Sequence, residues 1–140
     1  LHAAVQAELI RERKRREHKH RRAGPVKLII AIIQPTKLQA VKEALGKIEV
    51  TRMTITDAQG YGRQRGHSEM FRGHEYRIEL LSKVELQILV NDDFLEPTIE
   101  TILKTARTGA EGNIGDGKLW VVPADEAIRI SDGKRGQEAV

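Results

Sequence analysis

Two glycine-rich segments contain the residue types that bind anions. The first, residues 60–67, reads GYGRQRGH and directly follows alternating β-branched residues that predict a strand. Glycine lets backbone N–H groups approach an anion closely, and Arg63 and Arg65 add positive charge beside them. This composition indicates an anion-binding segment; the alternative is a hairpin tip without a ligand.

The second segment, residues 112–119, reads GNIGDGKL and satisfies the G-x-x-x-x-G-K part of a P-loop. Leu119 stands where a P-loop has Ser or Thr, and the segment leads into a predicted strand instead of a helix N-terminus. These two differences exclude a P-loop NTPase. Phosphate binding by the backbone of Gly115 and Gly117 with Lys118 stays physically sound, and the alternative is a simple turn.

No set of residues has the pattern of a nucleophile with a positioned base. Cysteine is absent, which excludes disulfides and thiolate chemistry, and His67 and His74 both lie on the predicted loop. A sensor or adaptor is therefore favoured over a small ATP-using enzyme. The third class is an RNA-binding domain, but Tyr61, Phe71 and Tyr76 lie on the glycine-rich loop and not mid-strand, where bases would stack.

Hydrophobic periodicity predicts one domain of alternating strands and helices. Residues 27–35 contain six consecutive apolar side chains and predict a strand buried on both faces, and residues 37–47 have helical spacing. Asn91 or Asp92 can cap a second helix. The other predicted elements are a strand at 50–58, a long loop, a strand at 78–90, the second helix to 106, a strand at 119–122 and an extended piece at 127–130.

The order βαββαβ predicts an α+β, ferredoxin-like fold. Its two helices can cover only one face of the sheet, so the other face needs a different cover. Because the first strand is apolar on both sides, we expect a second copy of the same sheet to supply it, in a homo-oligomer.

The first 25 residues differ sharply from the rest of the chain. They contain eight Lys or Arg and three Glu, whereas residues 26–140 carry 16 basic and 17 acidic groups. We expect residues 1–25 to be a disordered extension, either a translated upstream stretch with Val26 as the true start or a basic arm for an anionic surface. No apolar run reaches the 18 residues of a membrane helix.

Several motifs together resemble the P-II signal-transduction proteins over residues 26–140. They are KLIIAIIQPTKLQAVKEAL, GYGRQRGHSEMFRGHEY, NIGDGKLWV and AIRI, in this order. The resemblance implies a homotrimer of ferredoxin-like subunits and a cytoplasmic regulator of nitrogen metabolism that is not an enzyme. It also implies ATP or ADP, 2-oxoglutarate and Mg²⁺ as ligands, bound in the cleft between subunits.

The resemblance assigns roles to individual residues. Gln64 matches the Mg²⁺ ligand beside ATP and 2-oxoglutarate, and Lys83 matches the lysine that pairs with the distal carboxylate of 2-oxoglutarate. The expected nucleotide-binding residues are Gly60, Tyr61, Gly62, Arg63, Gln64, Gly115, Asp116, Gly117, Lys118 and Arg129.

Residues 61–79 resemble the partner-docking T-loop of the family. Implied partners are an ammonium transporter, nitrogen-assimilation enzymes or modifying enzymes, with no direct nucleic-acid binding. Tyr76 matches the tyrosine that is uridylylated in some members; the alternative is an unmodified contact residue.

Departures from the family pattern affect the expected phosphate contacts. Ser131 replaces a second basic residue in the C-terminal loop, about 130–137, and Lys134 or Arg135 could reach the site instead. Residues 110–113 lengthen the phosphate loop, about 107–118, by roughly three positions. His74 excludes phosphorylation of a serine at that position, and Phe71 lacks a hydroxyl.

Overall fold

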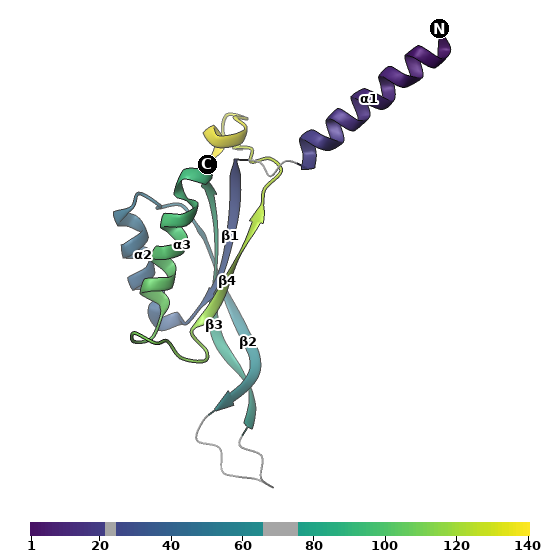
Figure 1. The fold of residues 1–140 in the computed structure, drawn as a ribbon. Coiled ribbons are helices and arrows are strands. Elements are labelled where there is room, and N and C mark those ends of the chain that lie inside the picture. The colour runs from purple at the N-terminus through teal and green to yellow at the C-terminus, as the bar shows by residue number, and fades with distance from the viewer. Residues whose placement is uncertain (22–24, 66–75) are drawn as a thin grey trace.

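The computed structural model describes residues 1–21, 25–65 and 76–140. A four-stranded antiparallel sheet has the order β2-β3-β1-β4, and α2 and α3 pack together on one of its faces (Figure 1). This is the ferredoxin-like arrangement predicted from the sequence. The elements are α1 His2–Arg21, β1 Val26–Ile33, the 3₁₀ turn Pro35–Lys37, α2 Leu38–Lys47, β2 Thr54–Arg65, β3 Tyr76–Asn91, α3 Asp92–Ala106, β4 Gly117–Pro123 and the 3₁₀ turn Gly136–Ala139.

The apolar run of β1 divides its side chains between the two faces of the sheet. Ile29, Ala31 and Ile33 are buried beneath the helices, and the residues between them are only half-buried. Val41 and Leu45 of α2, with Ile102 and Ala106 of α3, complete this core. The prediction of burial on both faces therefore holds for only one face of β1 in a single chain.

The face of the sheet away from α2 and α3 carries exposed apolar side chains. In the strand register Leu28 pairs with Leu89 and Val122, and Ile30 pairs with Trp120. Leu89, Trp120 and Val122 remain 41%, 39% and 39% exposed. An apolar surface of this kind typically marks an interaction site.

The segment predicted as a loop at residues 61–79 is shorter in the structure. β2 continues through Arg65 and pairs with β3 as far back as Tyr76, so both ends of the predicted loop form a two-stranded ribbon. Gly60 and Gly62 pair with Leu81 and Glu79, so both glycines lie within β2 despite the weak strand propensity of glycine. Residues 66–75, which include His67, Phe71 and His74, lie outside the described residues.

Two smaller expectations also differ from the structure. β2 starts at Thr54 instead of residue 50, and the extended piece expected at 127–130 is reduced to one isolated bridge between Ile128 and Arg135. Asn91 occupies the N-cap position of α3, although its side chain makes no capping hydrogen bond.

The expectation of disorder for residues 1–25 was wrong for residues 2–21, which form α1. Ala, Glu, Lys and Arg, which dominate this segment, have high helix propensities, and no Gly or Pro interrupts it before Gly24 and Pro25. The side chains of residues 1–15 are exposed. Among the helices in the described parts of the chain, none combines the length and the apolarity needed to span a bilayer.

Candidate functional site

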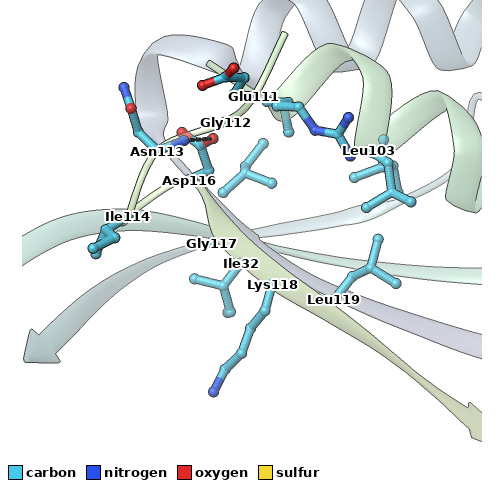
Figure 2. A pocket seen from close by; sticks show the side chains of 14 residues that line it. Ile32, Leu103, Glu111, Gly112, Asn113, Ile114, Asp116, Gly117, Lys118 and Leu119 are labelled. Atoms are coloured by element: carbon cyan, nitrogen blue, oxygen red, sulfur yellow. Dashed lines mark hydrogen bonds between the residues drawn. The ribbon is translucent and has the colours of Figure 1, made fainter. Parts of the chain in front are cut away.

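The turn that precedes β4 requires glycine at two positions. Gly115 and Gly117 have φ values of 101° and 105°, a conformation that other residues rarely adopt. A Cβ added to Gly117 would lie 1.8 Å from the carbonyl oxygen of Ile32. The turn therefore holds its backbone in close contact with the end of β1 (Figure 2).

The carboxylate of Asp116 holds this loop together from inside. It accepts hydrogen bonds from the Thr108 hydroxyl at 2.6 Å, the Thr108 amide at 3.0 Å and the Asn113 amide at 2.8 Å. These donors, with the Thr108 hydroxyl first, lower the pKa of Asp116 to about 2. Asp116 is thus ionised at neutral pH, and its carboxylate oxygens accept hydrogen bonds from the loop itself.

Lys83 and Gln34 attach the loop to the sheet. The Lys83 ammonium donates a hydrogen bond to the carbonyl oxygen of Gly115. The Gln34 side-chain amide donates to the same oxygen at 3.3 Å and to Asp116 Oδ1 at 3.3 Å. Lys83 also lies against Gly60, so both glycine-rich segments and Lys83 meet within one chain.

A cavity of about 500 Å³ lies between the C-terminal end of α3 and this loop. Its lining includes Ile102 and Leu103 from α3 and Glu111 and Asn113 from the lengthened segment of the loop. Figure 2 shows the side chains of Lys118 and Leu119 leaving β4 on opposite sides. Leu119 packs against the helix-side core, whereas Lys118 is exposed.

Arg129 lies at the opposite end of the sheet from the phosphate loop. Gly117 pairs with Ile33 at one end of β1 and Pro123 with Lys27 at the other, which spans about 20 Å of strand. Arg129 lines a second cavity of about 410 Å³ that also includes Asn91, the residue paired with Val26. One chain therefore does not bring Arg129 to Gly117 or Lys118.

Arg129 is held by residues of the C-terminal loop. Its guanidinium donates to Asp132 at 3.0 Å and to the carbonyl oxygen of Glu138. Its Nε is buried and has no partner among the residues that the structure describes. Ser131, the departure from the family pattern, is exposed, as are Lys134 and Arg135. Arg135 donates to Glu126 at 2.5 Å.

The remaining predicted residues lie on the β2–β3 ribbon. Tyr61 is 73% exposed. The backbones of Gly62, Arg63 and Gln64 pair with Glu79, Ile78 and Arg77, and Tyr76 begins β3 opposite Arg65. For residues 62–65 and 76–79 the structure describes the backbone alone.

Sequence reasoning missed Gln34 and Thr108 as parts of the site. Gln34 ends the first apolar run directly before Pro35, and Thr108 follows α3. Neither position belongs to a glycine-rich segment. A polar residue at the end of a buried strand beside the predicted anion loop was the available signal for Gln34.

The fold and this site define a ferredoxin-like protein with a glycine-lined loop at one end of its sheet. The family model for nitrogen regulatory protein P-II matches residues 26–134. The chain therefore belongs to the P-II family, as its motifs predicted.

Relatives of known name agree over nearly their whole length. Nitrogen regulatory protein GlnK1 of Methanosarcina mazei is 48% identical over 115 residues, 82% of this chain and 97% of the relative. Nitrogen regulatory protein P-II of Azospirillum brasilense is 44% identical over 115 residues, 82% of this chain and all of the relative.

Two solved structures resemble the chain. Arabidopsis thaliana PII bound to citrate superposes with a TM-score of 0.67 at 33% identity, covering 84% of this chain and 94% of that protein. The GlnK–ATP complex of B. subtilis superposes with a TM-score of 0.66 at 25% identity, covering 82% and 97%.

Proposed function

We propose that this protein reports nitrogen, carbon and energy status by binding ATP or ADP and 2-oxoglutarate, and that it regulates partner proteins through its T-loop. The observation that carries the proposal is the glycine loop at residues 115–117, whose backbone is pressed against β1 and followed by the exposed Lys118. Backbone N–H groups and a lysine ammonium suit a polyphosphate. ATP is the ligand named for the similar B. subtilis GlnK structure.

The nucleotide site is built between two copies of the chain. Because Arg129 and Lys118 lie at opposite ends of the sheet, they can act on one nucleotide only if Arg129 comes from a neighbouring copy. The apolar sheet face around Ile30 and Trp120 supplies a contact surface for that neighbour. We propose the homotrimer of the family as the assembly.

The described residues fit a nucleotide better than they fit a metal ion on its own. Within residues 1–21, 25–65 and 76–140 there is no group of three or more His, Cys, Asp or Glu side chains that could hold a metal. Mg²⁺ would therefore take most of its oxygen ligands from the nucleotide and 2-oxoglutarate, with Gln64 adding its amide oxygen. Asp116 is occupied by the loop, so its role is to shape the cradle.

Lys83 is the proposed partner for the distal carboxylate of 2-oxoglutarate. Its ammonium already lies at the phosphate loop, where it donates to Gly115. An effector held by Lys83 would therefore be next to the nucleotide, which explains how one site can read both ligands.

The β2–β3 ribbon links the ligand site to the T-loop. Gly60 contacts Lys83 at the base of the ribbon, and the paired strands continue to Arg65 and Tyr76 beside residues 66–75. A ligand then shifts the populations of the T-loop states, because it binds these states with different affinities. Proposed partners in the cytoplasm are an ammonium transporter, nitrogen-assimilation enzymes or modifying enzymes, the last of which could act on Tyr76.

Calorimetry tests this function directly. We expect 2-oxoglutarate with Mg²⁺ to bind tightly to ATP-loaded protein and weakly or not at all to ADP-loaded protein. Equal uptake with both nucleotides would contradict the energy-sensing role. Failure of ATP and ADP to bind the full chain would refute the proposed function altogether.

A further inference from the structure

One backbone oxygen in the phosphate loop is shared by two side chains from the sheet. The carbonyl of Gly115 accepts from Lys83, on β3, and from Gln34, which directly follows β1. Gln34 also reaches Asp116, the residue that organises the rest of the loop. These two donors therefore add to the contacts that hold the loop on the sheet.

Gly60 makes room for the Lys83 side chain on its way to Gly115. A Cβ at Gly60 would lie 3.2 Å from Lys83 Cγ and 3.5 Å from Cε. The close contact confines the stem of the lysine between β2 and the loop. An ammonium confined in this way loses little additional rotamer freedom when it forms its hydrogen bond.

The Gly115 carbonyl does not neutralise the charge of Lys83. Among residues 1–21, 25–65 and 76–140, no carboxylate forms an ion pair with this ammonium. In the Lys83–Gly115 hydrogen bond only the donor is charged, whereas a carboxylate would add the attraction between two opposite charges. A carboxylate ligand arriving at Lys83 can therefore displace the Gly115 oxygen.

We propose that Lys83 exchanges partners: it holds the phosphate loop through Gly115 when no effector is bound, and it passes to the effector carboxylate when one binds. This inference rests on the proposed function, in which 2-oxoglutarate is that effector. Gln34 stays on Gly115 and Asp116 throughout and retains the loop after Lys83 leaves. Gln34 is thus a positioning residue for the nucleotide loop in the effector-bound state.

Amide hydrogen exchange of the ligand-free full chain tests, without any nucleotide, whether Lys83 holds the phosphate loop. The reporter is the peptide covering residues 107–119, which includes the Asp116 amide bonded to the Asn113 carbonyl at 3.2 Å. We expect Lys83→Met to raise its exchange rate roughly tenfold, since a hydrogen bond to a charged donor is lost. Lys47→Met, an exposed lysine on α2, is the matched control and should change nothing.

A second set of variants distinguishes the contribution of Gln34 from that of Lys83. Gln34→Ala alone should raise exchange of the same peptide by a few-fold, and Lys83→Met with Gln34→Ala should exceed the product of the single effects. With ATP, Mg²⁺ and 2-oxoglutarate bound, Gln34→Ala should loosen the loop more than it does in the ADP-bound protein, because Lys83 has then left Gly115.

The proposal is overturned if Lys83→Met leaves the exchange of residues 107–119 at the wild-type rate. It is also overturned if the effect of Gln34→Ala is the same with and without 2-oxoglutarate in protein shown to bind it. Loss of ADP binding in the wild-type chain would refute the proposed function instead. The ligand-free exchange experiment would still decide whether Lys83 holds the loop.

Discussion

At the scale of single residues, the shape of the loop requires particular residue types at two positions. Gly117 is one of these positions, because any side chain would collide with the backbone of β1. Asp116 is another, since its carboxylate collects three donors from residues 108 and 113. Both shape the loop from within, and neither needs to contact a ligand to be required for binding.

Gly117→Ala should abolish nucleotide binding and destabilise the protein. The added Cβ would lie 1.8 Å from the Ile32 carbonyl oxygen, and the positive φ adds strain on the order of 1–3 kcal/mol. Gly109→Ala is the matched control, because its φ of 65° is also positive but no described atom lies within 4 Å of its added Cβ. Calorimetry with ATP and a thermal melt check both; equal effects of the two changes would show that the clash is not the cause.

Asp116→Asn should loosen the phosphate loop at neutral pH and remove a pH-dependent part of the stability. The pKa of Asp116 is lowered to about 2 in the folded protein, so its stabilising effect is present above its ordinary value of 3.8 and is lost as pH falls through about 2. The difference in unfolding free energy between wild type and Asp116→Asn should therefore shrink between pH 4 and pH 2. Urea titrations measure it, with the exposed Asp125→Asn as control; a difference independent of pH would contradict this account.

At the scale of elements, the candidate site residues lie at the two opposite ends of the sheet. One end of β1 contacts the phosphate loop, and the other lies beside the cavity that contains Arg129. The β2–β3 ribbon extends from the first of these ends toward residues 66–75 (Figure 1). Helix α1 has exposed side chains over residues 1–15, and none of these described side chains lines either cavity.

Deleting residues 1–25 should leave the P-II domain folded and able to bind nucleotide. The matched family segment begins at residue 26, and the described side chains of α1 do not line either cavity. We expect the melting temperature to change by no more than about 2 °C, the range of surface changes. A large drop in ATP affinity measured by calorimetry would instead make α1 part of the nucleotide site.

At the scale of the whole molecule, one chain contains only half of each proposed nucleotide site. The phosphate loop and Arg129 are separated by the length of the sheet, and the apolar face between them is partly exposed. Assembly would bury this face and bring the two halves together at the same time. Oligomeric state and nucleotide affinity should therefore change together.

Trp120→Glu should prevent assembly and, with it, nucleotide binding. A charge at this position would be buried against a second copy, whereas in the single chain Trp120 is 39% exposed and the charge can remain hydrated. Val121→Glu is the control, because Val121 has a similar 37% exposure on the same strand but belongs to the opposite face. Light scattering gives the oligomeric state and calorimetry the ATP affinity; a Trp120→Glu monomer that binds ATP like wild type would contradict the shared site.

The sequence by itself determined the order of the elements, the family and the positions of the two glycine-rich segments. These features are local, because hydrophobic period and glycine spacing report backbone conformation within a few residues. Local propensity also accounts for α1, because its Ala, Glu, Lys and Arg residues favour a helix despite the repulsion among its charges.

Only the tertiary structure decided which residues meet. The hydrogen bonds of Lys83 and Gln34 to Gly115 join positions more than 30 residues apart, and strand register with side-chain reach sets such contacts. Register also lengthened the β2–β3 ribbon and placed Arg129 at the far end of the sheet from Lys118. Pairing between distant segments depends on the packing of the whole sheet, which no local pattern of residues specifies.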